Sequence, residues 1–415
     1  MMQKKTLVVA ALTLLTAACE LWARAEFFRV EDLKPGMRGT GRTVFQGTKP
    51  EEFQVEILGV MHGISPGASA VLARFSGGPL ANTGVFEGMS GSPVFIDGKL
   101  LGAVAFAFQF SKDPIGGITP ITQMVGAFED SGAVGSGGIR IQVKKSLLWQ
   151  HLLPPAATDQ GGGFLQSLPL GWEEQSAPVR SSGHSLVPIA TPLALGGVPP
   201  VTVRTFDAQL RAMGFSLFQG SGASQGAGAS RKPAASDGAA LEPGSNIAIP
   251  LVRGDLDASA GGTVTYIEGD KLYAFGHLLF NLGFTELPMH KAYALTVFPS
   301  LQSSFKILET AEPVGTIRQD RSSGIYGVLG QKTKMIPMAV QMTTSRGAKK
   351  ELRYEIARDQ FLTPFLVNFT VFNSIVASER GLGVSTLRVK GTISIKGASS
   401  CQVVPYSVHC SPSDC

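Results

Sequence analysis

The segment with the clearest chemical potential is Gly88-Met89-Ser90-Gly91-Ser92-Pro93. A serine nucleophile needs its hydroxyl presented on a tight turn, with backbone N–H groups aimed at the oxyanion that develops on the carbonyl. The flanking glycines permit that turn, and the bare Cα of Gly88 leaves room for a carbonyl. The N–H groups of Gly88 and Ser90 are therefore the candidate oxyanion hole. The same residues also suit a structural loop between two strands, so the segment alone leaves both interpretations open.

A serine nucleophile needs a base, and His277 is the best candidate in the chain. It follows a predicted strand and a turn glycine in Tyr273-Ala274-Phe275-Gly276-His277. A histidine at a strand end is often purely structural. Its distance from Ser90 in the sequence is no objection, because the members of a catalytic triad meet in space.

The composition favours short strands and turns as the elements that position these residues. The chain has 415 residues with 50 Gly and 25 Pro, and only 16% are charged. Average chains carry about 25% charged residues and fewer glycines and prolines, which argues against helical bundles and coiled coils. With 44% hydrophobic residues, the chain is long enough to bury a core in each of several domains.

Residues 26–135 are predicted to form a β lobe that carries Ser90, here called the serine lobe. Alternating apolar residues predict strands at 53–58 and 70–75. Two further apolar runs meet across Asp97-Gly98, which is a strong signal for a β-hairpin.

Residues 246–345 are predicted to form a second β lobe, the histidine lobe. Its strand candidates are 247–252, 262–267, 271–275 and 292–297, with a turn at 268–270.

Between the lobes, residues 136–245 are rich in glycine and proline and are predicted to be a flexible linker. The expected linker includes the Pro-rich stretch 188–200, and only 205–215 is expected to be helical. Residues 346–415 are expected to be a C-terminal extension of β type, truncated or replaced after Lys396, in which 358–373 fits either a helix or a strand.

The N-terminus has the features of an export signal. Lys4-Lys5 precedes the apolar run 7–18, and Ala23-Arg24-Ala25 is a small-x-small cleavage site, so we expect 1–25 to be a signal peptide. An alternative is a lipoprotein that begins at Cys19, although the usual leucine lies one place too early. No later apolar run has the roughly 18 residues of a membrane helix. The mature chain is expected to be exported, in the periplasm or outside the cell.

Several partner classes are not expected. The net charge is +5 and the pI is about 9.0, but the basic residues are scattered, so nucleic-acid binding is not predicted. No metal or cofactor is expected, because zinc and phosphate-loop motifs are missing. The C-terminal group of Cys401, His409, Cys410 and Cys415 has poor spacing for zinc, and three cysteines after the signal leave one thiol unpaired.

The serine segment, with Thr83-Gly84 before it and a hairpin and Asp113-Pro114 after it, resembles the nucleophile region of the SpoIVB-type serine peptidases, the sporulation signalling proteases. The turn Ala274-Phe275-Gly276-His277 is similar to the histidine motif of that family. Residues 303–306 and 314–327 resemble segments that follow the histidine there. The resemblance covers most of both predicted lobes.

The resemblance implies a mainly all-β fold with two chymotrypsin-like barrels and the catalytic groups in the cleft between them. Ser90 is then the nucleophile, His277 the base, and the amides of Gly88 and Ser90 the oxyanion hole. The implied function is an exported serine endopeptidase that cleaves protein or peptide substrates without a cofactor.

The sequence departs from this family in three ways. The serine lobe precedes the histidine lobe, so the lobes are in permuted order, and no PDZ-like domain is evident. Ser76 occupies the position where the family has its triad aspartate, so the triad acid is unassigned. Disrupting that role costs on the order of 10⁴ in rate.

Other acids near the two motifs in sequence are compatible with ordinary turn or surface roles: Glu87, Asp255, Asp257, Asp270 and Glu286. The alternative function is therefore a catalytically impaired module of the same fold. Such a module would bind an extended peptide by strand addition, or serve as a scaffold in the cell envelope. Ser76 is the feature that favours it.

Overall fold

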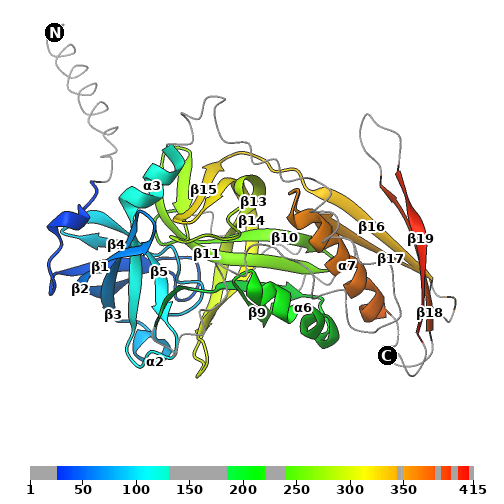
Figure 1. Cartoon of the computed structure of the whole chain (residues 1–415), viewed down its shortest axis with the longest axis horizontal. Coiled ribbons are helices and arrows are strands. Elements are labelled where there is room, and N and C mark those ends of the chain that lie inside the picture. Colours follow the sequence, from blue (N-terminus) through cyan, green and yellow to red (C-terminus); the bar gives the residue numbers. More distant parts are fainter. Residues whose placement is uncertain are drawn as a thin grey trace, which may run out of the picture.

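The computed structural model describes residues 26–129, 185–220, 240–343, 347, 349–378, 385–393 and 401–410, the last two ranges by their backbone alone. The expected signal peptide with Cys19 lies outside these residues, and so do 130–135 of the expected serine lobe and 136–184 and 221–239 of the expected linker. Two β-barrels lie side by side, the first drawn in blue and cyan and the second in green and yellow (Figure 1).

The first barrel is a closed ring of six antiparallel strands, because β4 pairs with both β1 and β5. In ring order the strands are β1 (Arg38–Thr43), β2 (Glu51–Ser65), β3 (Ala68–Ser76), β6 (Ile115–Pro120), β5 (Lys99–Phe108) and β4 (Pro93–Ile96). The predicted alternation is confirmed in β2, where Phe53, Val55 and Ile57 point into the core. The short helices η1 (Val30–Asp32), α2 (Leu80–Thr83) and α3 (Ile121–Glu129) complete this unit.

The predicted hairpin at Asp97-Gly98 joins β4 to β5. Both turn residues have positive φ, 48° at Asp97 and 75° at Gly98. A two-residue turn of this kind matches the twist of paired strands, and it requires residues that tolerate the left-handed region. The serine segment leads directly into this hairpin.

The second barrel is also a closed six-stranded antiparallel ring, because β10 pairs with both β11 and β13. Its strands are β10 (Asn246–Gly254), β13 (Gly283–Phe298), β14 (Phe305–Arg321), β15 (Gly324–Leu329), β12 (Lys271–Ala274) and β11 (Asp257–Glu268). The prediction of a mainly all-β double barrel is confirmed.

Part of the expected linker is ordered structure. It contains β7 (Leu186–Pro188), β8 (Thr191–Gly196), α6 (Pro200–Ala212) and β9 (Phe215–Gln219). The prediction of a flexible linker is wrong for these elements, since β7 pairs with β5 of the first barrel and β8 with β11 of the second. The expected helix also starts earlier, with Pro200 in its first turn, where a proline loses no helical hydrogen bond.

The C-terminal extension begins by widening the second sheet. β16 (Ile336–Thr343) and β17 (Lys349–Ile356) form a hairpin that pairs with β10 through β17. Helix α7 (Leu362–Ser378) follows, and β18 (Ser385–Ile393) pairs with β19 (Cys401–Cys410). The cysteine-bearing tail is thus partly a strand. None of the helices that the structure describes has the length and apolar character needed to cross a membrane.

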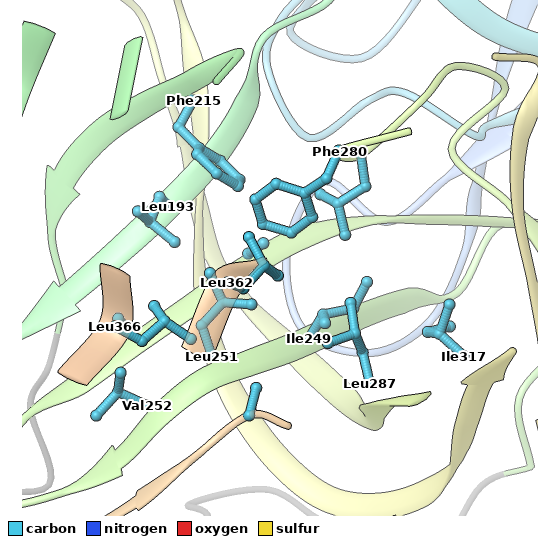
Figure 2. Close-up of a cluster of buried hydrophobic side chains, with 14 of the residues drawn as sticks. Leu193, Phe215, Ile249, Leu251, Val252, Phe280, Leu287, Ile317, Leu362 and Leu366 are labelled. Atoms are coloured by element: carbon cyan, nitrogen blue, oxygen red, sulfur yellow. The ribbon is translucent and has the colours of Figure 1, made fainter. Parts of the chain in front are cut away.

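One hydrophobic core joins these added elements to the second barrel. Figure 2 shows Leu362 and Leu366 of α7 and Leu193 of β8 around Leu251 of β10, with Phe215 and Phe280 facing each other. The rings of Phe215 and Phe280 are 5.2 Å apart, edge to face. Phe280 belongs to the loop after His277, so this core anchors the segment that carries the candidate base.

Candidate active site

The serine segment is a buried turn between α2 and β4. Gly88 and Gly91 both have positive φ, 86° and 93°, which L-residues with side chains rarely adopt. The Ser92 hydroxyl donates to the Met89 carbonyl at 2.6 Å and is therefore structural. Ser90 is fully buried, and its Oγ has no hydrogen-bond partner in the part of the chain that the structure describes.

Strand β11 of the second barrel holds the backbone of this turn. The N–H of Thr263 donates to the Ser90 carbonyl at 2.9 Å, and its hydroxyl donates to the Gly88 carbonyl at 3.0 Å. A Cβ at Gly91 would lie 1.9 Å from the Thr263 oxygen and 2.6 Å from the Phe275 nitrogen. The two barrels therefore meet at the serine turn with no space for a side chain.

The histidine turn packs in the same way against the first barrel. Phe275 and Gly276 have φ of 72° and 71°, an uncommon conformation for a phenylalanine. A Cβ at Gly276 would lie 2.8 Å from the Cβ of Ala103, and the hydroxyl of Thr119 donates to the Gly276 carbonyl at 2.6 Å. Phe275 also donates its N–H to the Thr263 carbonyl at 3.3 Å. Thr263 thus bonds both segments that carry the predicted catalytic pair.

The His277 ring has a defined tautomer. Nδ1 lies 2.7 Å from the Leu278 carbonyl oxygen, which only accepts, so Nδ1 carries the proton and Nε2 is the unprotonated nitrogen. Burial lowers the pKa of His277 to about 4, against the opposing effect of the Leu278 hydrogen bond. The imidazole is therefore neutral at physiological pH and able to accept a proton at Nε2.

Complementary groups are left unpartnered at this junction. Ser90 Oγ is a donor and His277 Nε2 an acceptor, and each is buried without a hydrogen-bond partner among the described residues, including one another. The amides of Gly88 and Ser90 also donate no hydrogen bond within the described ranges. Buried polar groups are nearly always paired, so unpaired groups on two segments that Thr263 links need a functional explanation.

None of the acids considered from the sequence holds His277, because Nδ1 is bonded to Leu278. Ser76, at the family's acid position, is an exposed residue at the end of β3 and pairs with Gln54. Asp255 accepts the Arg353 amide at 2.7 Å, and Asp257 accepts the Ser259 hydroxyl at 3.0 Å. A backbone carbonyl therefore orients the imidazole where a carboxylate would be expected.

Glu87 lies next to Gly88 at the serine turn, and its hydrogen bond goes to Ser303 and not to His277. Its Oε1 accepts the Ser303 hydroxyl at 2.6 Å, while Oε2 is buried without a partner among the described residues. Burial raises the pKa of Glu87, and the hydrogen bond from Ser303 opposes this effect.

Lys306, which the sequence did not single out, lies against Glu87 and Gly88 of the serine turn. Its N–H donates to the Glu87 carbonyl at 2.9 Å, and its Cβ is 3.0 Å from where a side chain on Gly88 would begin. Its Nζ donates to Thr43 Oγ1 at 3.1 Å and to Asn246 Oδ1 at 2.8 Å. Burial lowers the pKa of Lys306 to about 7.

Asp320 is the second residue that the sequence analysis missed. It is fully buried on β14 and accepts the N–H groups of Leu279, Phe280 and Leu282 at 2.9, 2.6 and 3.2 Å. Burial raises its pKa to about 6, although these hydrogen bonds act in the opposite direction. In the sequence it lies close to Arg318 and Arg321, which suggests a solvated position.

Residues 30–125 match the family described as SpoIVB peptidase S55. The matched range includes Ser76, Gly88 and Ser90 and ends before the histidine barrel, so it bears on the nucleophile and not on the base. No curated protein and no solved structure matches the chain.

Proposed function

Residues 30–125 match the SpoIVB peptidase S55 family, and from that premise we propose that the chain is an exported serine endopeptidase. In this proposal Ser90 is the nucleophile and His277 the general base. The amides of Gly88 and Ser90 stabilise the oxyanion. The substrate is a protein or peptide, and no cofactor takes part.

The proposed reaction is acyl transfer in two steps. Ser90 Oγ forms a bond to the substrate carbonyl carbon while its proton passes to His277 Nε2, and the two amides bind the oxygen that becomes negative. The C–N bond then breaks, and the leaving amine takes the proton from Nε2. A water molecule releases the acyl group from Ser90 by the same sequence, with His277 again accepting a proton and returning it.

The observation that carries the proposal is the pair of unpartnered atoms, Ser90 Oγ and His277 Nε2, on two segments that Thr263 bonds together. Nδ1 is already bonded to Leu278, so Nε2 is the unprotonated nitrogen that can accept the serine proton. Catalytic hydrogen bonds are often long or absent without substrate, which agrees with the missing direct bond.

The burial of Ser90 favours a second candidate function. Its exposed fraction is 0%, so a peptide reaches the hydroxyl only after the contacts around the turn open. A catalytically impaired module that binds peptides or acts as an envelope scaffold needs no such access. Ser76 in the place of the family's acid points the same way.

Labelling with a fluorophosphonate separates these functions, because the probe reacts with a serine only when it is activated. We expect the wild-type protein to be labelled and Ser90→Ala and His277→Ala to be unlabelled. Ser92→Ala is the matched control, since Ser92 lies in the same turn and its hydroxyl bonds Met89. Wild-type protein that stays unlabelled between pH 5 and 9 would overturn the peptidase in favour of the binding module.

Export is proposed from the sequence of residues 1–25. The mass of the mature protein purified from its native host tests it, with Glu26 expected as the N-terminal residue. A lipid-modified N-terminus at Cys19 would instead support envelope association. A chain that retains Met1 would contradict export by either route.

A further inference from the structure

One peptide unit joins Asp320 to the histidine. The carbonyl oxygen of Leu278 accepts the Nδ1 proton of His277 at 2.7 Å. The N–H on the other side of that same peptide bond belongs to Leu279, and it donates to Asp320 Oδ1 at 2.9 Å. In a trans peptide the C=O and N–H groups point in opposite directions, so the two hydrogen bonds form a continuous chain from carboxylate to imidazole.

Such a chain transmits polarity. A negative carboxylate at the N–H end pushes electron density through the amide to the carbonyl oxygen, which makes that oxygen a better acceptor for Nδ1–H. Hydrogen bonds in a row strengthen one another, and the effect is largest where solvent is excluded. Asp320 and His277 are both buried, with exposed fractions of 0% and 3%, so water does not screen the interaction.

We infer that Asp320 is a positioning residue that serves His277 through the Leu278–Leu279 peptide, in place of a triad carboxylate bonded directly to the imidazole. The inference rests on the proposed function and deepens it. It explains how the proposed catalytic pair could work without an acid bonded to the imidazole, because the family's acid position holds the uncharged Ser76. It also explains why a carboxylate is buried at Asp320 with no basic partner among its hydrogen bonds.

Asp320 also has a structural role, which the test must separate from its charge. Its Oδ2 accepts the amides of Phe280 and Leu282, so it fixes the whole loop after His277. The side chain of Phe280 fixes the same loop independently by packing on Phe215 (Figure 2). Loosening the loop through Phe280 therefore changes its rigidity and leaves the carboxylate in place.

The test combines a spectroscopic and a kinetic measurement on the full-length protein. Asp320→Asn keeps the size of the side chain and removes its charge. In wild-type protein labelled with ¹⁵N-histidine, the His277 resonance should show a proton on Nδ1 and none on Nε2. In Asp320→Asn the Nδ1 proton should shift upfield as its hydrogen bond weakens. The rate of fluorophosphonate labelling should fall about 10- to 100-fold, less than the loss for a triad that also loses its tautomer.

Two controls separate charge from packing. Phe280→Leu loosens the loop and should leave the Nδ1 proton shift in place. Asp257→Asn removes a half-buried carboxylate in the same barrel and should change neither the shift nor the rate. If Asp320→Asn does not fold, Asp320→Glu is measured instead, and an intermediate shift and rate are expected.

The inference is overturned if Asp320→Asn leaves both the shift and the rate unchanged, or if Phe280→Leu reproduces its shift. For Asp320→Glu, which keeps the charge, an Nδ1 proton shift that stays constant as the pH is taken through the pKa of the carboxyl group would likewise overturn it. Wild-type protein that resists labelling refutes the proposed function alone. The ¹⁵N measurement then still decides whether Asp320 polarises His277.

Discussion

The buried Lys306 makes a quantitative prediction about how stability depends on pH. Its Nζ lies between the two barrels, bonded to Thr43 of the first and Asn246 of the second, and it is fully buried. Two acceptors match the two hydrogens of a neutral amine. Burial lowers the pKa of Lys306 from 10.5 to about 7, so the folded protein gives up the proton at a pH where the unfolded chain keeps it.

The sign and size of the effect follow from proton linkage. Between pH 7 and 10.5 the unfolded state binds more protons than the folded state, so the free energy of unfolding rises with pH. When the pH is below both pKa values, a pKa shift of this size lowers the free energy of unfolding by about 5 kcal/mol relative to a neutral lysine. The free energy of unfolding therefore rises by about 2 kcal/mol between pH 7 and pH 9.

Lys306→Met removes the titrating group and keeps most of the buried volume. Urea unfolding at pH 7 and pH 9 gives the free energy of unfolding of each protein. The stability lost on substitution should be larger at pH 9 than at pH 7 by about 2 kcal/mol. Lys271→Met is the matched control, because Lys271 lies exposed at the start of β12. A loss that is equal at the two pH values would refute a neutral, buried Lys306.

Two further predictions concern the catalytic pair and the contact between the barrels. Acidification should slow fluorophosphonate labelling of the wild type in two steps, near pH 6 as Asp320 takes up a proton and near pH 4 as His277 does. The Asp320→Asn variant should show only the step near pH 4. A single step at the ordinary histidine pKa of 6.5 would contradict the buried, neutral imidazole. Gly91→Ala should abolish labelling and lower the free energy of unfolding, measured with urea, by about 3 kcal/mol or more, because its Cβ would clash with Thr263. Gly98→Ala is the control, since Gly98 also has a positive φ but has open space around it, and this change should lower the free energy of unfolding by about 1 kcal/mol. Equal losses for the two glycine variants would show that the barrels do not meet tightly at the serine turn.

The parts of the fold with strong local signals could be predicted from the sequence. Asp97-Gly98 specifies a hairpin by the backbone conformation it permits, and the alternation in β2 shows which side chains face the core. The prolines and glycines of 188–200 suggest a flexible linker, and this prediction is wrong for the ordered part of the stretch. Its strand β8 is instead stabilised by burying Leu193 and Leu195 against the second barrel, a tertiary contact that local composition does not show.

The site divides in the same way. Ser90 and His277 lie in short turns whose glycines indicate the backbone geometry, so both could be proposed without a structure. Asp320 could not, because its neighbours Arg318 and Arg321 suggest a solvated strand. Its importance comes from a loop 40 residues away in the chain that folds back onto it, as the bond from the Phe280 amide shows.

The most direct test of the central claim is to trap the acyl intermediate. The protein is mixed with an activated acetyl ester, quenched in acid, and analysed by peptide mass spectrometry. We predict one acetyl group on Ser90 in the wild type and in Ser92→Ala, and none at this position in His277→Ala. Acetylation of Ser90 that persists without His277, or a wild-type protein acetylated only at other residues, would contradict it.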